Sequence, residues 1–211
     1  MPQITQPETK HGRALEALRR SICLHPPGED MVLHETSLTE KFGMSRTPIR
    51  QVLQRLAYER LVETRSGVGT VVVALDPETR PRDSLVHKGL LQAVLLLDLP
   101  QISIAQHSDL MAVAGMASLA HDSDRDLHYD IWNRLHVLLS GLIPDPILKD
   151  VFSASYWRIV RWKMSDVATD AVAGEAHLRS FVKHLSEYEA QDSADLLKRA
   201  IDAEMGETQP S

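Results

Sequence analysis

The stretch from Ser45 to Val73 constrains the fold of this chain more than any other, because its hydrophobic periodicity changes abruptly along it. Ser45 is a preferred N-cap residue, and Pro48 falls in the first turn of the helix that would follow, where a missing N–H costs nothing. The later part, LVETRSGVGTVVV, holds two β-rich runs around Gly67 and Gly69, which predicts a hairpin. The helix itself is predicted by apolar residues at i, i+3, i+4 and i+7 that form one core-facing stripe: Ile49, Val52, Leu53 and Leu56.

Three shorter elements precede this helix. Residues 11–24 carry leucine and isoleucine near helical spacing, and HPPGED ends that helix because two prolines and a glycine cannot continue it. MVLHE predicts a short strand, and SLTEKFG predicts a short helix with Gly43 just past its end. The order helix, strand, helix, helix, hairpin is that of a winged helix-turn-helix, which we expect over residues 1–74.

The second part of the chain has a different pattern. The stretch ALDPETRPRDS carries two prolines and several charges, so residues 75–83 are predicted to be a linker. Beyond it the β signals disappear, and residues 84–211 are predicted to form an all-α bundle large enough to enclose a ligand cavity. The expected fold class is therefore mostly α. The six helical segments fall at roughly 84–98, 102–120, 124–142, 145–165, 168–190 and 192–206.

Charge is unevenly distributed along the chain. The formal net charge is −6, yet residues 1–80 carry about +1 and residues 81–211 carry about −7. Residues 36–72 hold six basic side chains and three acidic ones. A locally basic segment on an acidic protein indicates local contact with phosphate rather than a coat of nucleic acid over the whole chain.

Composition and the N-terminus exclude several other classes. No run of about 18 uncharged apolar residues is present, so no membrane span is expected. The first residues, MPQITQPETKHGR, lack the apolar core of a signal peptide, and we expect a cytoplasmic protein. The single Cys23 excludes an internal disulfide and a cysteine-rich zinc site.

The polar face of the helix after Ser45 is the candidate DNA-reading surface. Arg46 and Arg50 lie four residues apart and project from one side near the helix N-terminus, where backbone N–H groups also attract phosphate. An arginine fork can bind guanine O6 and N7 or a phosphate, whereas serine and threonine hydroxyls suit phosphate. The alternative is an ordinary solvated helix face. The candidate DNA-binding residues, including those of the hairpin tip, are Ser45, Arg46, Thr47, Arg50, Gln51, Gln54, Arg65, Ser66 and Gly67.

The segment LTEKFGMSRTPIRQVLQRLAYERLVETRSGVGTVV resembles the DNA-binding domain of the GntR family of bacterial transcription factors, and the likeness extends from Ala14 to Val73. The resemblance implies a non-enzymatic regulator of transcription, expected to be a repressor and a homodimer that binds a pseudo-palindromic double-stranded operator. It also implies operator contacts from SRTPIR and from the wing tip at Ser66 and Gly67. Some members carry arginine at the start of the second helix, where this chain has Thr36.

The helical part resembles the effector-binding and dimerisation (FCD) domain of the FadR subfamily, in its six-helix VanR-like branch. That resemblance implies a small carboxylate-containing effector and a metal such as zinc, held by one aspartate and three histidines. The stretch WNRLHVLLSGLIPDPIL places His136 at the first histidine, but Trp132 stands at the aspartate position. The second histidine falls on His177, and RAIDAEM has none for the last position.

Two interpretations of these histidines remain open. His136 and His177 bind a metal with help from His128 or His184, or they line the effector cavity or pack in the core while Trp132 fills the space of the metal site. The basic residues expected to meet an anionic effector are Arg134, Arg158 and Arg161. The competing classes are a winged-helix protein whose helical domain is a metal-dependent enzyme, or one that docks a partner and binds no ligand.

Overall fold

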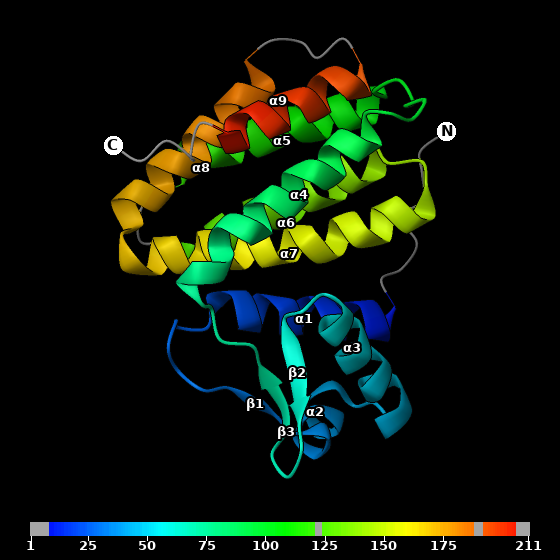
Figure 1. Cartoon of the computed structure of the whole chain (residues 1–211), viewed down its shortest axis with the longest axis vertical. Helices are drawn as coiled ribbons and strands as arrows, with labels where there is room; N and C mark the ends of the chain where they lie inside the picture. The colour runs from blue at the N-terminus through cyan, green and yellow to red at the C-terminus, as the bar shows by residue number, and fades with distance from the viewer. Residues whose placement is uncertain (1–8, 121–123, 188–191, 206–211) are drawn as a thin grey trace. The chain divides into compact units, whose positions relative to one another are not determined.

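The computed structural model describes residues 9–120, 124–187 and 192–205, and the chain divides into two compact units (Figure 1). The N-terminal unit is Met1–Leu75 and the helical unit is Asp76–Ser211. Of the residues that were predicted to be a linker, Leu75 ends the N-terminal unit and residues 76–83 belong to the helical unit. Pro77–Thr79 form a 3-10 turn, and residues 80–83 are the first turn of a helix.

The N-terminal unit contains the predicted elements in the predicted order. Strand β3 is central in the antiparallel sheet order β1-β3-β2, with Val32 opposite Val71 and Val62 opposite Val72. Figure 1 shows β2 and β3 as a hairpin beside the three helices, which is the wing of a winged helix-turn-helix. The elements are α1 (Lys10–Leu24), β1 (Val32–Leu33), α2 (Glu35–Phe42), α3 (Arg46–Tyr58), β2 (Val62–Arg65) and β3 (Gly69–Val72).

The core of the N-terminal unit lies between α1 and α3. The stripe predicted from the sequence, from Ile49 to Leu56, is buried, and it packs with Ala14, Leu18 and Ile22 of α1. The apolar face of α3 is thereby fixed inward, so its polar face lies on the surface.

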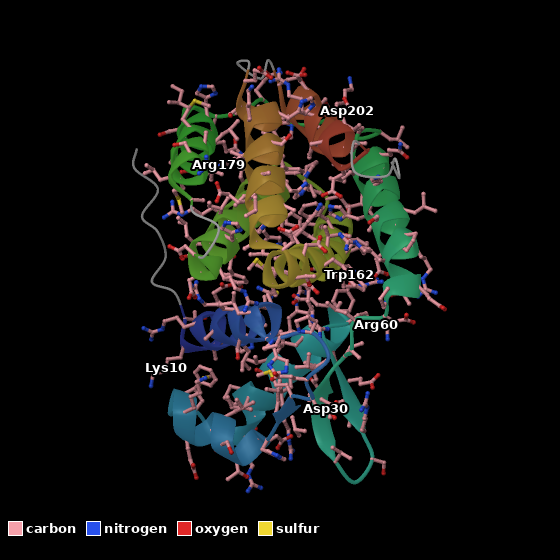
Figure 2. All side chains as sticks on the ribbon, turned by 90° about the vertical axis from the view of Figure 1, so that its left-hand side faces the viewer. Lys10, Asp30, Arg60, Trp162, Arg179 and Asp202 are labelled. Carbon is pink, nitrogen blue, oxygen red and sulfur yellow. The ribbon has the colours of Figure 1, made fainter. Side chains whose placement is uncertain are left out.

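A Schellman motif ends α3. The amide of Leu61 bonds to the carbonyl of Leu56, and the amide of Arg60 bonds to that of Ala57, each at 3.0 Å. This motif needs a left-handed residue, and Arg60 takes that role with φ of 58°, where glycine is the usual choice. Figure 2 labels Arg60 at this junction.

A buried carboxylate fastens α1 to the end of α3. Glu59 has no exposed surface, and it accepts bonds from Arg19 Nε at 2.8 Å and from Arg55 Nε at 2.9 Å. A second bond from the Arg19 guanidinium reaches the other oxygen of Glu59. Charged groups this deep are tolerated when they are paired and hydrogen-bonded.

The helical unit contains the six predicted helices with adjusted bounds. Helix α7 is the longest, and it packs against α4, α6 and α8 (Figure 1). Because it meets several neighbours, it buries residues around most of its circumference instead of one stripe. The helices are α4 (Arg80–Val94), α5 (Ile104–Leu119), α6 (Arg125–Gly141), α7 (Pro146–Thr169), α8 (Ala171–Ser186) and α9 (Ser193–Met205).

Candidate nucleic-acid interface and helical pocket

The nine residues predicted to meet DNA are all exposed, and they come from α3 and the turn of the wing. Ser45 is the N-cap of α3 in extended geometry, but its side chain makes no capping hydrogen bond. Its hydroxyl therefore stays available to an outside acceptor or donor. Arg46 forms no hydrogen bond or ion pair within the described part of the N-terminal unit, so its full charge faces solvent.

Arg50 is held by a carboxylate of α2. Its Nε lies 2.9 Å from Oε1 and 3.0 Å from Oε2 of Glu35, and this hydrogen bond raises the pKa of the Arg50 guanidinium. Sequence reasoning missed Glu35, because the two residues lie on different helices. They share a groove of about 220 Å³ with residues of α3 and of both wing strands: Leu53, Gln54, Ala57, Thr64 and Thr70.

The wing turn is compact and rich in glycine. The amide of Val68 bonds to the carbonyl of Arg65 at 3.1 Å, and Gly67 and Gly69 have φ of 75° and 119°, a region that favours glycine. Arg65 itself is paired with Glu63 at 2.8 Å, and both side chains are about half exposed. The three candidate arginines thus differ in ion pairing. Arg50 and Arg65 each pair with a glutamate, whereas Arg46 forms no ion pair within the described part of the N-terminal unit.

The helical unit contains a pocket of about 440 Å³. Two predicted effector residues line it together: the rings of Trp132 and His177 stack with centroids 6.1 Å apart and planes 19° apart. Their stacking gives the pocket a flat apolar wall next to polar groups. The other lining residues are Arg80, Lys163, Asp166, Val167, Thr169, Asp170, Ala173 and Gly174.

A buried lysine lies beside this wall and was not predicted. Lys163 is 4% exposed, and its Nζ lies 2.9 Å from His177 Nε2. An ammonium group has no lone pair, so His177 accepts through Nε2 and carries its proton on Nδ1. Lys163 follows Arg158 and Arg161 in the stretch WRIVRWK, and periodicity does not tell which of these cations points toward a pocket.

The rim of the same pocket holds an ion pair between α4 and α7. Arg80 donates from both terminal nitrogens to Asp166, at 2.7 and 2.5 Å, and its guanidinium lies 5.5 Å from the Trp162 ring. Bidentate pairs of this kind fix geometry as well as charge. Arg80 was assigned to the linker by sequence reasoning, so its place at the pocket was also missed.

His136 lies in a different environment from His177. Its Nε2 is 3.0 Å from Ser153 Oγ, and its ring contacts Tyr156 and Trp157 at 5.2 and 5.0 Å. His136 is absent from the pocket lining.

The histidines predicted as metal ligands are therefore not gathered. His128 is fully buried, whereas His184 is exposed. Within residues 9–120, 124–187 and 192–205, no three His, Cys, Asp or Glu side chains lie together as a metal site requires.

The three arginines predicted to meet an effector do not line the pocket. Arg134 is exposed on α6. Arg158 pairs with Asp83, which also accepts a bond from Trp162 Nε1 at 3.1 Å. Arg161 is buried within α7. The cations that line this pocket are instead Arg80 and Lys163, and contact of the three predicted arginines with an effector stays a prediction.

A second buried histidine was not predicted. His87 Nδ1 lies 2.8 Å from Ser155 Oγ, which itself donates to the carbonyl of Phe152. Because the serine proton is committed, His87 donates from Nδ1. Burial, together with the charges of Lys163 and Lys88, lowers the pKa of His87 to about 3. His87 is therefore neutral at physiological pH.

Comparison with known proteins bears on both units. Residues 11–72 match the sequence model of the family described as bacterial regulatory proteins, gntR family. No curated protein sequence matches this chain. Within the part of the chain that the structure describes, no helix combines the length and apolar character needed to cross a membrane.

Two solved structures share the fold over most of the chain. McbR/YncC of E. coli is 14% identical, with a TM-score of 0.68 and coverage of 94% of both chains. A putative transcriptional regulator GntR from Rhodococcus sp. RHA1 is 17% identical, with a TM-score of 0.51 and coverage of 95% of this chain and 99% of that one. These likenesses confirm a winged helix-turn-helix followed by a helical unit.

Proposed function

We propose that the chain is a DNA-binding transcriptional regulator of the gntR family, whose sequence model matches residues 11–72, and that a small carboxylate bound in its helical unit controls it. The observation that carries the DNA-binding half is the exposed polar face of α3 behind Ser45. The observation that carries the sensing half is the pocket that Trp132, His177 and Lys163 share.

We propose that α3 enters the major groove. Arg46 and Arg50 then contact base edges or phosphates. Ser45 and Thr47 bind phosphate through their hydroxyl groups. The wing tip, with Arg65, Ser66 and Gly67, adds contacts to the neighbouring backbone or minor groove. The glutamines that complete the face are Gln51 and Gln54.

The test of this half begins with duplexes selected by the protein from random DNA. Arg46→Ala and Arg50→Ala should each weaken binding to the selected sequence by about 1–3 kcal/mol, roughly 5- to 150-fold, if the residue reads a base edge. Arg13→Ala is the matched control, because Arg13 is an exposed arginine of α1. Equal losses in all three variants would contradict the assignment to α3.

The chemistry of the pocket points to an anionic ligand. Lys163 is a buried cation, and the stacked rings of Trp132 and His177 suit a flat or apolar body next to the charge. A small carboxylate is the simplest ligand that has a negative charge for Lys163 and an apolar body for the two rings. An all-α unit of this kind also supports placement in the FadR subfamily, where such domains bind effectors.

Ligand binding is tested by thermal unfolding in a panel of small mono- and dicarboxylates. A true ligand should raise the unfolding temperature of the wild type, because it binds only the folded state. Lys163→Met should abolish the shift, whereas Lys149→Met should keep it, since Lys149 is on the same helix but outside the pocket. Operator binding is measured with and without the ligand, and release by the ligand is expected of a repressor.

We also propose a homodimer that acts on a pseudo-palindromic operator in the cytoplasm. The support is α5, which packs against α6 and α8 but keeps large apolar side chains outside: Ile104 is 91% and Leu119 71% exposed, with Met111 between them on the same face. A second copy would cover this face. Light scattering of the purified protein tests it, and Ile104→Lys should reduce the measured mass toward that of one chain.

A further inference from the structure

We propose that Glu35 is a positioning residue that converts Arg50 from a phosphate-binding cation into a reader of guanine. The inference rests on the proposed contact of α3 with DNA and adds a source of sequence discrimination outside α3. The observation that supports it is that the Glu35 carboxylate binds the Arg50 guanidinium through Nε.

Glu35 occupies only one edge of Arg50. Both carboxylate oxygens lie at hydrogen-bond distance from the same nitrogen, Nε, at 2.9 and 3.0 Å. The two terminal nitrogens have no partner within the described part of the N-terminal unit. Those two nitrogens form the fork that matches O6 and N7 of guanine. The contact therefore restrains the side chain and leaves its recognition edge open.

The restraint acts on a side chain that would otherwise move. Arg50 is 61% exposed, and a long side chain at this exposure samples many rotamers that must be given up on binding. Glu35 comes from the first turn of α2, and its side chain is 36% exposed in the groove between α2, α3 and the wing. The pair is thus formed before DNA arrives, which reduces the ordering required at the moment of binding.

The carboxylate also changes what Arg50 can contact. Its negative charge cancels most of the attraction between Arg50 and a distant phosphate, and it repels a phosphate placed beside Nε. A guanine edge is neutral and offers two acceptors in the plane of the fork, so it pays no such penalty. Glu35 therefore lowers affinity for DNA in general and raises the preference for one base pair.

The experiment compares three variants with the wild type in full-length protein. Binding is measured to the duplex selected by the wild type, to duplexes with each base pair changed, and to random DNA, over a range of salt. Glu35→Gln removes the charge, and Glu35→Asp keeps the charge but shortens the reach. Glu40→Gln is the matched control, because Glu40 is an exposed glutamate of the same helix and forms no ion pair within the described residues.

The expected result is specific to one base pair. Glu35→Gln and Glu35→Asp should each lower discrimination at that position by roughly tenfold, within the range that a bidentate arginine contact supplies. Glu35→Gln and Glu40→Gln should both bind random DNA a few-fold more tightly, and Glu40→Gln should keep its discrimination. In an Arg50→Ala background, Glu35→Gln should leave discrimination unchanged.

Two other results would overturn the inference in distinguishable ways. If Glu35→Gln binds every duplex more tightly by the same factor as Glu40→Gln, Glu35 is merely a surface charge and the inference fails alone. If the wild type selects no preferred sequence, the inference and the proposed reading of DNA fail together. Circular dichroism confirms that each variant is folded, and Glu35→Asp gives a second, charge-conserving comparison.

Discussion

Replacing Glu59 with glutamine should destabilise the N-terminal unit while leaving the helical unit unchanged. The carboxylate has no exposed surface, and it is the shared acceptor for Arg19 and Arg55. Glutamine keeps the shape and one acceptor oxygen, but it removes the charge and places an N–H₂ group against arginine donors. Arg19 and Arg55 then lose the negative charge of Glu59 beside them.

The magnitude follows from the burial of the three side chains. Removing one partner of a buried ion pair costs about 3–5 kcal/mol, because the other charge stays desolvated. The side chains of Arg19 and Arg55 are 11% and 29% exposed, so water recovers part of that cost. We expect a loss of about 2–3 kcal/mol. With an m-value of about 1 kcal/mol/M for a small unit in urea, the midpoint should fall by about 2–3 M.

The distribution of tryptophan allows the two units to be followed separately. All three tryptophans, at positions 132, 157 and 162, lie in the helical unit, so their fluorescence reports that unit alone. Far-ultraviolet circular dichroism reports both units. In Glu59→Gln the dichroism curve should acquire an early step, while the fluorescence midpoint stays in place.

Glu63→Gln is the control for this experiment, since Glu63 is paired with Arg65 at an exposed position where such pairs contribute about 0–1 kcal/mol. The reasoning is refuted if Glu59→Gln and Glu63→Gln shift the dichroism midpoint equally. It is also refuted if the early step appears in fluorescence, because the loss would then belong to the wrong unit.

Three further predictions concern stability. His87 has a pKa lowered to about 3 in the folded state and near 6.5 in the unfolded chain, so the unfolded state binds more protons between these values and the free energy of unfolding decreases as the pH is lowered. The wild type should lose about 2 kcal/mol from about pH 6.5 to about pH 5 at this site, and His87→Asn should lose correspondingly less in urea titrations followed by fluorescence; equal losses would contradict the assignment. Gly174→Ala should destabilise the helical unit by about 1–3 kcal/mol, because its Cβ would lie 2.5 Å from Val167 Cγ2 and 2.9 Å from Val167 Cα; Gly115→Ala, with open space around it, should be neutral or stabilising. Arg60→Gly should stabilise the N-terminal unit by up to about 1 kcal/mol, because glycine adopts a φ of 58° without strain, and an unchanged or lower dichroism midpoint would argue that the Arg60 side chain contributes compensating contacts.

Local sequence signals were sufficient where one helix face decides the outcome. The apolar stripe from Ile49 to Leu56 allows only one orientation of α3. When the stripe is buried, the opposite face, which carries Arg46 and Arg50, lies on the surface. The hairpin could also be predicted from the sequence, because Gly67 and Gly69 adopt backbone conformations that favour glycine. The predicted DNA-reading face therefore follows from periodicity and turn chemistry.

Helix α4 begins inside the segment predicted to be a linker, because a proline can either interrupt a helix or lie in its first turn. Pro77 and Pro81 suggested an irregular segment, but Pro81 lies in the first turn of α4, where a proline needs no backbone donor. The helix therefore begins earlier than predicted, and this brings Arg80 to the rim of the pocket. A proline near a helix start does not by itself place the boundary.

The pocket could not be assembled from sequence, because its residues come from several helices. His177 and Lys163 are on different helices, and α7 is buried on too many sides for its pattern to show where Lys163 points. The contact between Glu35 and Arg50 was missed for the same reason, since it joins two helices across a turn. Contacts of this kind depend on how helices pack, which spacing along one helix does not encode.

The bond between Lys163 and His177 has a consequence for what can enter the pocket. Neither partner can accept a hydrogen bond from a ligand at this wall, because the Lys163 ammonium has no lone pair and His177 uses its one ring lone pair to accept from Lys163. A ligand must therefore supply the hydrogen-bond acceptors at this wall, and a protonated ligand has fewer acceptor lone pairs than an ionised one. The pKa of the ligand therefore affects its binding, and the pocket discriminates between ligands by their ionisation state as well as by their shape.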